Sequence, residues 1–142
     1  MQLYPLIFET DENGTVIAQA KDVPEAITVG RDAIEATARA ADALVAALRG
    51  YIEDARPIPR PSRPRRDQPC AVLPPQATAK LAIYQAMRAA GLTQTGLAER
   101  LGCDPRQVRR LLDLDHRSRL DQLEIALAAL GKRLVLEVQD AA

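Results

Sequence analysis

The sequence predicts an α+β protein with two domains: an antiparallel β-β-β-α-β domain over residues 1–73, and a helical domain over residues 74–142 that ends in a strand. Three observations predict this class. Short apolar segments separated by turn residues fill the first 30 positions, apolar residues then recur at helical spacing, and seven of the ten prolines lie between positions 57 and 75. Because proline does not continue a helix, we place the domain boundary near Pro74 and Pro75.

The first domain is predicted to contain four short strands. Asn13-Gly14 is a strong hairpin signal, so residues 2–9 and 15–20 are predicted to be paired strands. Residues 26–29 follow as a third strand. Residues 68–73, between prolines, are predicted to supply a fourth strand, because so small a sheet needs cover for its open edge.

A helix over residues 31–54 is predicted between the third and fourth strands. Apolar residues recur there at steps of three and four, which places them on one face of a helix. The predicted apolar face consists of Ile34, Ala38, Ala41, Val45, Leu48 and Ile52.

The second domain is predicted to consist of short helices that end at glycines, followed by a strand. Thr93 and Asp104 are predicted N-caps, and Ser118 with Asp121 resembles a capping box. The predicted elements are helices over 78–90, 94–101 and 105–113, a leucine-rich helix that ends at Gly131, and a strand over 134–138.

Residues 94–111 carry the strongest local signal. A helix-turn-helix needs a small residue where its helices cross, a tight turn, and apolar residues beneath the second helix. Ala98, Gly102, Val108 and Leu111 stand at that spacing. Over residues 78–131 the pattern resembles the Cro/repressor type of helix-turn-helix.

The resemblance implies a recognition helix over residues 105–112 and a set of DNA-binding residues. Arginine can pair with guanine and glutamine with adenine in the major groove, and residues at a helix start can bind phosphate. The alternative is that these residues only solvate a small helical bundle. The candidates are Thr93, Gln94, Pro105, Arg106, Gln107, Arg109, Arg110 and Arg117.

Charge is distributed unevenly along the chain. Residues 1–54 carry four basic and ten acidic side chains, residues 55–66 carry five arginines and no acid, and residues 67–142 carry ten basic and nine acidic side chains. The formal net charge of zero is therefore the sum of an acidic domain, a basic connector and a nearly neutral domain. A solubilising surface with a basic linker would explain this pattern, and so would two modules with different partners.

The chain as a whole resembles the HicB antitoxin family. Tyr4-Pro5 opens a strand, Asp22-Val23-Pro24-Glu25 stands where the family has an aspartate-leucine-proline-glycine turn, and Thr28-Val29-Gly30 precedes the helix. The segment Ile58-Pro59-Arg60-Pro61-Ser62 matches the family's isoleucine-proline-x-proline-serine end. Glu25 replaces a glycine of the family pattern, and Arg31 replaces its usual aspartate.

This resemblance implies a first domain with a truncated ribonuclease H-like fold that masks a HicA-type toxin, a small basic ribonuclease that cleaves mRNA. It also implies repression of the operon through the second domain, bound to operator DNA. An acidic surface suits a basic partner. The candidate toxin-binding residues are Glu9, Asp11, Glu12, Asp22 and Glu25.

Two other functions remain open from the sequence. One is a repressor whose first domain senses a small ligand, and the other is a metal-dependent nuclease. The nuclease reaction needs several carboxylates that converge on metal ions, and none stands at a strand centre. We therefore expect no catalytic residue, metal site or cofactor, and no enzymatic activity.

A homodimer or a dimer of dimers is expected, because helix-turn-helix proteins bind two half-sites. The dimerisation candidates are Leu134, Val135, Leu136 and Val138; the alternative is that this strand folds back on its own domain. Cys70 and Cys103 match no metal-site spacing. We recognise no secretory signal or membrane span, and we expect a cytoplasmic protein with no membrane partner.

Overall fold

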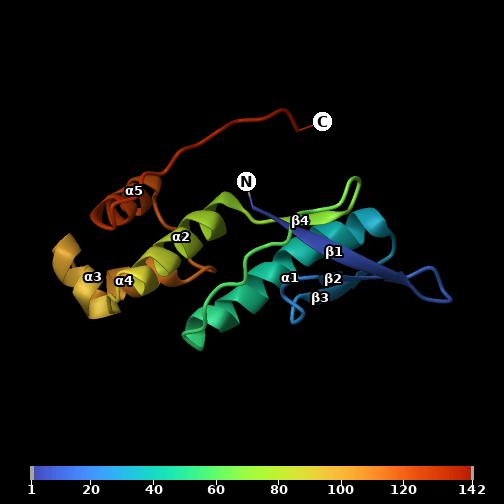
Figure 1. Ribbon diagram of the computed structural model, residues 1–142, viewed down its shortest axis with the longest axis horizontal. Coiled ribbons are helices and arrows are strands. Elements are labelled where there is room, and N and C mark those ends of the chain that lie inside the picture. Colours follow the sequence, from blue (N-terminus) through green and yellow to red (C-terminus); the bar gives the residue numbers. More distant parts are fainter. Residues whose placement is uncertain (1, 142) are drawn as a thin grey trace. The chain divides into compact units, whose positions relative to one another are not determined.

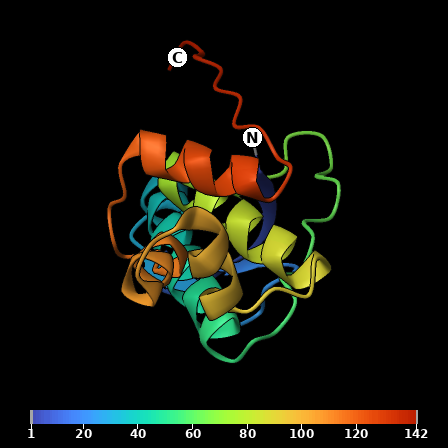
Figure 2. The same cartoon turned by 90° about the vertical axis from the view of Figure 1, so that its left-hand side faces the viewer.

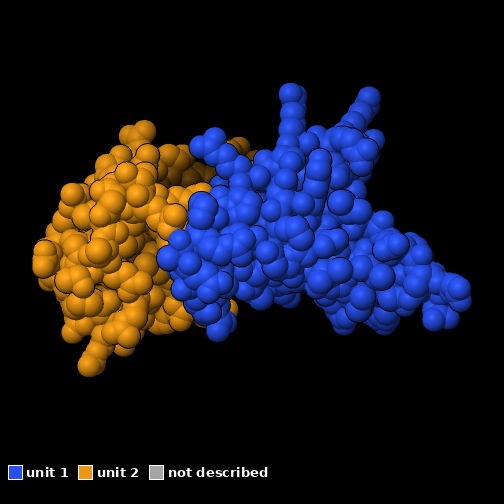
Figure 3. All heavy atoms as spheres, turned by 60° about the horizontal axis from the view of Figure 1, so that its bottom comes forward, with its two compact units in different colours: residues 1–78 blue, residues 79–142 orange. Residues whose placement is uncertain are grey.

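The computed structural model describes residues 2–141 and confirms the α+β class, with an antiparallel four-stranded sheet followed by helices (Figure 1). The chain divides into two compact units, residues 1–78 and residues 79–142 (Figure 3). The division lies within helix α2 (Pro75–Ala89), a few residues beyond the boundary that the prolines suggested.

The sheet of the first unit has the order β3-β2-β1-β4 with every neighbouring pair antiparallel. Its strands are β1 (Leu3–Thr10), β2 (Val16–Ala20), β3 (Ile27–Gly30) and β4 (Cys70–Val72), all close to the predicted positions. The predicted hairpin turn forms: the Asp11 carboxylate accepts hydrogen bonds from the backbone N–H groups of Asn13 and Thr15, both at 2.9 Å.

Pro5 lies in an interior strand, where proline is normally excluded. Its missing N–H costs no ladder bond, because β2 ends at Ala20, which pairs with Leu6. Its carbonyl still accepts a hydrogen bond from Lys21 N–H at 2.9 Å. The proline therefore sits just beyond the end of the neighbouring strand.

Helix α1 (Ala33–Glu53) lies along one face of the sheet (Figure 1). Of the predicted apolar face, Leu48 is buried and Ala41, Val45 and Ile52 are half-buried, but Ile34 and Ala38 are exposed, so the buried face is rotated from the predicted one. The buried residues are Ala36, Ala40, Leu44, Leu48 and Tyr51, whereas Ile34 is 83% exposed.

Close approach to the sheet explains this choice of face. A Cβ added to Gly30 would lie 2.4 Å from the backbone nitrogen of Ala36, so the end of β3 all but touches the helix. Only small residues fit where the backbones come so near. The alanines therefore face the sheet, and the bulkier Ile34 points away.

The proline-rich connector packs against the first unit. Ile58 is buried, and the Tyr4 hydroxyl donates a 2.8 Å hydrogen bond to the Pro59 carbonyl. The Ser62 backbone N–H and hydroxyl each donate to the Asp22 carboxylate at 2.6 Å. Prolines reduce the entropy that is lost when such a segment becomes ordered.

The second unit is helical, with α3 (Gln94–Leu101), α4 (Pro105–Leu112) and α5 (Leu120–Ala129) after the end of α2. Its core is mostly leucine and alanine, as the shortage of aromatic residues requires. Buried side chains include Leu81, Ile83, Tyr84, Met87, Leu97, Ala98, Val108, Leu111, Leu123 and Leu127.

The predicted strand over residues 134–138 is wrong. Residues 132–141 have no regular secondary structure, and Figure 2 shows this C-terminal segment, in red, running away from the helices of its unit. Val135, Leu136 and Val138 are 75%, 61% and 97% exposed. A strand needs a hydrogen-bonded neighbour, and no described strand of the chain pairs with this segment.

We expect Gly30→Ala to destabilise the first unit by roughly 1–3 kcal/mol, because the new methyl group would overlap the backbone of α1. Gly50→Ala is the matched control. Gly50 lies within α1 and has no atom within 4 Å of an added Cβ, so alanine should raise the free energy of unfolding by about 0.5–1 kcal/mol. Denaturant unfolding of the full chain measures both. An unchanged midpoint for Gly30→Ala would contradict the close approach.

Candidate functional site

Local chemistry fixes the path from α3 to α4. Thr93 caps α3 by accepting a 2.9 Å hydrogen bond from Gly96 N–H, and Asp104 caps α4 by accepting one of 2.8 Å from Arg106 N–H. Gly102 ends α3 with φ of 64°, a left-handed conformation that favours glycine. Pro105 then occupies the first turn of α4. The two helices are thus joined by only three residues, 102–104.

Helix α4 has one buried face and one strongly basic exposed face. Val108, Leu111 and Leu112 are buried in the unit. Arg106, Gln107, Arg109 and Arg110 are exposed. Thr93, Gln94, Pro105 and Arg117, the other DNA-binding candidates from the sequence, are also exposed.

The structure brings only some of these candidates together. Gln107, Arg110 and Arg117 line one pocket of about 400 Å³ beside α4 and α5. Its walls also include Arg119, His116 and Ser118, while Leu101, Leu111 and Ile125 give it apolar surface. Thr93, Gln94, Pro105, Arg106 and Arg109 are not among the residues that line this pocket.

Lys80 of α2 is fully buried, and the sequence pattern does not predict this. Its ammonium donates hydrogen bonds to the Arg110 carbonyl at 2.6 Å and to the Ser118 hydroxyl at 2.8 Å. Burial lowers the pKa of Lys80 to about 8, and the negative charge of Asp113 opposes that shift. No local signal marks this lysine, because a lysine on an amphipathic helix is normally exposed.

The predicted capping box at Ser118 and Asp121 is wrong, because the Ser118 hydroxyl binds Lys80 and does not cap α5. The N-cap of α5 is Arg119, and it makes no side-chain cap hydrogen bond. Ser118 is 5% exposed and turns inward. A buried ammonium that needs oxygen partners accounts for this orientation.

Three of the five acidic candidates have partners within the first unit. Asp11 holds its own turn, Asp22 holds Ser62 of the connector, and Glu25 accepts hydrogen bonds from the Tyr51 hydroxyl at 2.8 and 3.0 Å. The backbone N–H of Glu25 and then the Tyr51 hydroxyl hold the pKa of Glu25 below its usual value. Glu9 and Glu12 are the exposed candidates without such a role among the described residues.

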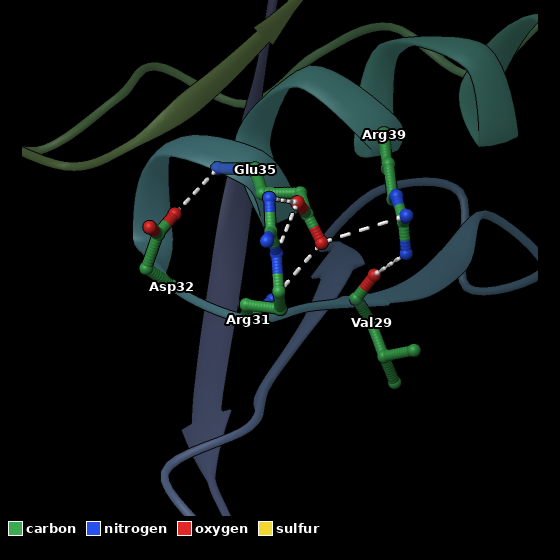
Figure 4. Close-up of polar contacts among 5 residues, drawn as sticks. All are labelled: Val29, Arg31, Asp32, Glu35 and Arg39. Atoms are coloured by element: carbon green, nitrogen blue, oxygen red, sulfur yellow. Dashed lines mark hydrogen bonds and ion pairs between the residues drawn. The ribbon is translucent and has the colours of Figure 1, made fainter.

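A further acid, Glu35, is neutralised at the start of α1 (Figure 4). Arg31 donates to it at 2.8 Å, and an Arg39 nitrogen lies 3.5 Å from it. The Arg31 guanidinium lowers the pKa of Glu35. Arg39 also donates to the Val29 carbonyl at 3.2 Å, so a charged side chain covers the edge strand β3. Asp32, the residue after Arg31, caps the helix by accepting a hydrogen bond from Glu35 N–H at 2.8 Å.

The described residues contain neither a metal-ligand cluster nor a membrane-spanning helix. Among residues 2–141, no three His, Cys, Asp or Glu side chains gather as metal ligands would. Within the same residues, no helix combines the length and apolar character needed to cross a membrane. Cys70 and Cys103 are both unpaired thiols.

Comparisons with known proteins cover nearly the whole chain. Residues 3–82 match the model of a family described as the HicB-like antitoxin of bacterial toxin–antitoxin systems. The chain is 38% identical over 133 residues to antitoxin HicB 2 of Photorhabdus laumondii, a match that covers 94% of each protein. It is 33% identical to antitoxin HicB of Escherichia coli K12, over 94% of this chain and 96% of that protein, and 33% identical to antitoxin HicB of Pseudomonas fluorescens, over 92% and 90%. The chain therefore belongs to the HicB antitoxin family.

Proposed function

We propose that the protein is an antitoxin that binds and neutralises a HicA-type, mRNA-cleaving ribonuclease and represses its own operon by binding DNA. Membership of the HicB family and the names of its relatives support the antitoxin role. The first unit would bind the toxin, and the second would bind operator DNA as a helix-turn-helix.

The observation that supports the proposed DNA binding is that α4 is amphipathic, with one apolar and one basic face. Its apolar residues anchor it in the unit, so a basic face is presented outward on a rigid element. A helix of this kind, preceded by a three-residue turn, fits the major groove as the recognition helix of a helix-turn-helix does. Arg109 and Gln107 would read bases, while Thr93, Gln94 and Arg117 would hold phosphates.

The proposed toxin binding is supported by a difference among the acidic side chains of the first unit: some have partners within the unit and others face solvent. Asp22 and Glu25 accept hydrogen bonds from Ser62 and Tyr51, and Glu35 is paired with Arg31, so these three carboxylates already have partners within the unit. Glu9 and Glu12 lie at and beyond the end of β1, where they face solvent. They form the local acidic surface that would attract a small basic ribonuclease.

Dimerisation would give the exposed C-terminal segment a partner. Leu134 is half-buried beside α5, whereas Val135, Leu136 and Val138 are exposed and belong to no helix or strand of the described chain. Pairing with the same segment of a second copy would satisfy the backbone and cover the apolar side chains. Two copies would also place two recognition helices on two half-sites of the operator.

We expect Arg109→Ala to reduce discrimination between operator and unrelated DNA by about 1–3 kcal/mol, because a bidentate contact to a base would be lost. Arg133→Ala removes one positive charge outside α4 and is the control. It should weaken binding to both DNAs equally. Titration of labelled duplexes from the region upstream of the gene measures both. Equal losses on every sequence for Arg109→Ala would argue against a base-reading role.

The double variant Glu9→Lys/Glu12→Lys should associate with the toxin roughly tenfold more slowly at low ionic strength, because electrostatic steering is reversed there. Asp42→Lys changes the charge of an exposed acid on α1, outside the candidate set, and should have a smaller effect. Stopped-flow mixing with the ribonuclease encoded beside the gene gives the rates. Rates for the double variant that match those of the wild type at every salt concentration would refute this assignment.

Truncation after Gly131 should convert a dimer to a monomer, because it removes the whole apolar segment. Truncation after Val138 keeps that segment and should leave the dimer intact. Light scattering across a range of protein concentrations separates the two cases. A stable dimer from the shorter chain would show that residues 134–138 are not the dimer contact.

A further inference from the structure

Lys80 is the one lysine of the described second unit that lies fully inside it. Removing an ammonium ion from water is costly, and buried charges persist where hydrogen bonds and nearby negative charge compensate for them. Here the compensation is modest. The ammonium has a backbone carbonyl at 2.6 Å and a hydroxyl at 2.8 Å, and Asp113 supplies the nearby negative charge.

The two oxygens belong to the two segments that carry the proposed DNA contacts. The Arg110 carbonyl lies in the last turn of α4, where the partial negative charge of a helix end favours a cation. Ser118 follows Arg117 directly and belongs to the loop between α4 and α5. One ammonium therefore joins α2, the end of α4 and the base of that loop.

We infer that Lys80 is a positioning residue for DNA reading: it fixes the rotation of α4 and the place of Arg117 relative to one another. This inference rests on the proposed DNA-binding function and deepens it. Lys80 itself is fully buried and touches no DNA. It acts through Arg110 and Ser118, whose neighbours Arg109 and Arg117 face solvent.

A purely structural role of Lys80 would lead to a different experimental result. Methionine nearly matches lysine in length and fills apolar space well, and replacing a buried charge with an apolar group of similar volume is often neutral or stabilising. The Arg110 carbonyl would keep its hydrogen bond from Asp113 N–H at 3.3 Å. If Lys80 only stabilises the fold, its replacement should lower the stability of the protein. If Lys80 positions the DNA contacts, its replacement should reduce discrimination between DNA sequences and leave the fold intact.

The test compares full-length wild type with Lys80→Met and Ser118→Ala, with Lys132→Met as the control. Lys132 is an exposed lysine of the same unit, so Lys132→Met is the same substitution and also removes one positive charge, but at the surface. Each protein is titrated with a duplex from upstream of its gene and with a scrambled duplex. Each is also unfolded with denaturant between pH 7 and pH 10.5.

We expect Lys80→Met to lose roughly tenfold in affinity for the operator duplex, the scale of one disturbed base contact, with little change on the scrambled duplex. Ser118→Ala should lose part of this affinity. A further variant that combines Lys80→Met with Ser118→Ala should lose no more than Lys80→Met alone, because both residues act through one contact. Lys132→Met should lose affinity equally on both duplexes.

Unfolding provides the independent readout. The folded chain has the lower pKa at Lys80, so the unfolded chain binds more protons between about pH 8 and pH 10.5. The free energy of unfolding of the wild type should therefore rise with pH across that window, relative to Lys80→Met. At pH 7 Lys80→Met should be as stable as the wild type or more stable.

Operator discrimination by Lys80→Met equal to that of the wild type overturns the inference, and so does a loss of stability that fully accounts for weaker binding. If Lys80→Met does not fold, Ser118→Ala decides: unchanged discrimination there overturns the inference as well. A wild-type chain that binds the upstream duplex no better than the scrambled one would instead overturn the proposed DNA-binding function, and the inference with it.

Discussion

The close approach of β3 to α1 is the constraint on which the rest of the first unit depends. Gly30 brings the end of the strand so near to Ala36 that a small residue must face the sheet in the first turns of the helix. This sets the rotation of α1 along its whole length. Tyr51 is thereby placed in the core, where its hydroxyl donates to Glu25 and the Arg56 guanidinium lies 4.1 Å from its ring centre. The turn before β3, the end of α1 and the start of the connector are thus held together by one helix orientation.

The second unit depends on a different kind of interaction, a buried charge. Its apolar core of leucines and alanines is sufficient to assemble three short helices, but apolar contacts are non-directional. The Lys80 ammonium adds direction, because it donates hydrogen bonds to two specific oxygens. The last turn of α4 is held in this way, and α4 is the helix that carries the basic face.

The formal net charge of zero conceals how the charges are used. In the first unit, Asp22, Glu25 and Glu35 stabilise the connector, the core tyrosine and the start of α1. Acids of this kind are structural, although the sequence presents them as part of one acidic surface. Glu9 and Glu12 stay outside that network. In the second unit, the arginines of α4 are exposed and concentrated on one helix face.

The sequence by itself determined the elements whose formation is local: the Asn13-Gly14 hairpin, the caps at Thr93 and Asp104, the left-handed Gly102, and the family. The hairpin, the caps and the glycine each depend on residues a few positions apart, which turn chemistry reports directly, whereas the family follows from several such segments taken together. Only the tertiary structure decided which face of α1 is buried, that Ser118 turns inward, and that Asp22 and Glu25 bind within their own unit. It also left residues 134–138 without the strand that their apolar pattern suggested. The physical reason is that each of these outcomes depends on a partner distant in the chain, or outside it, whose position no local pattern encodes.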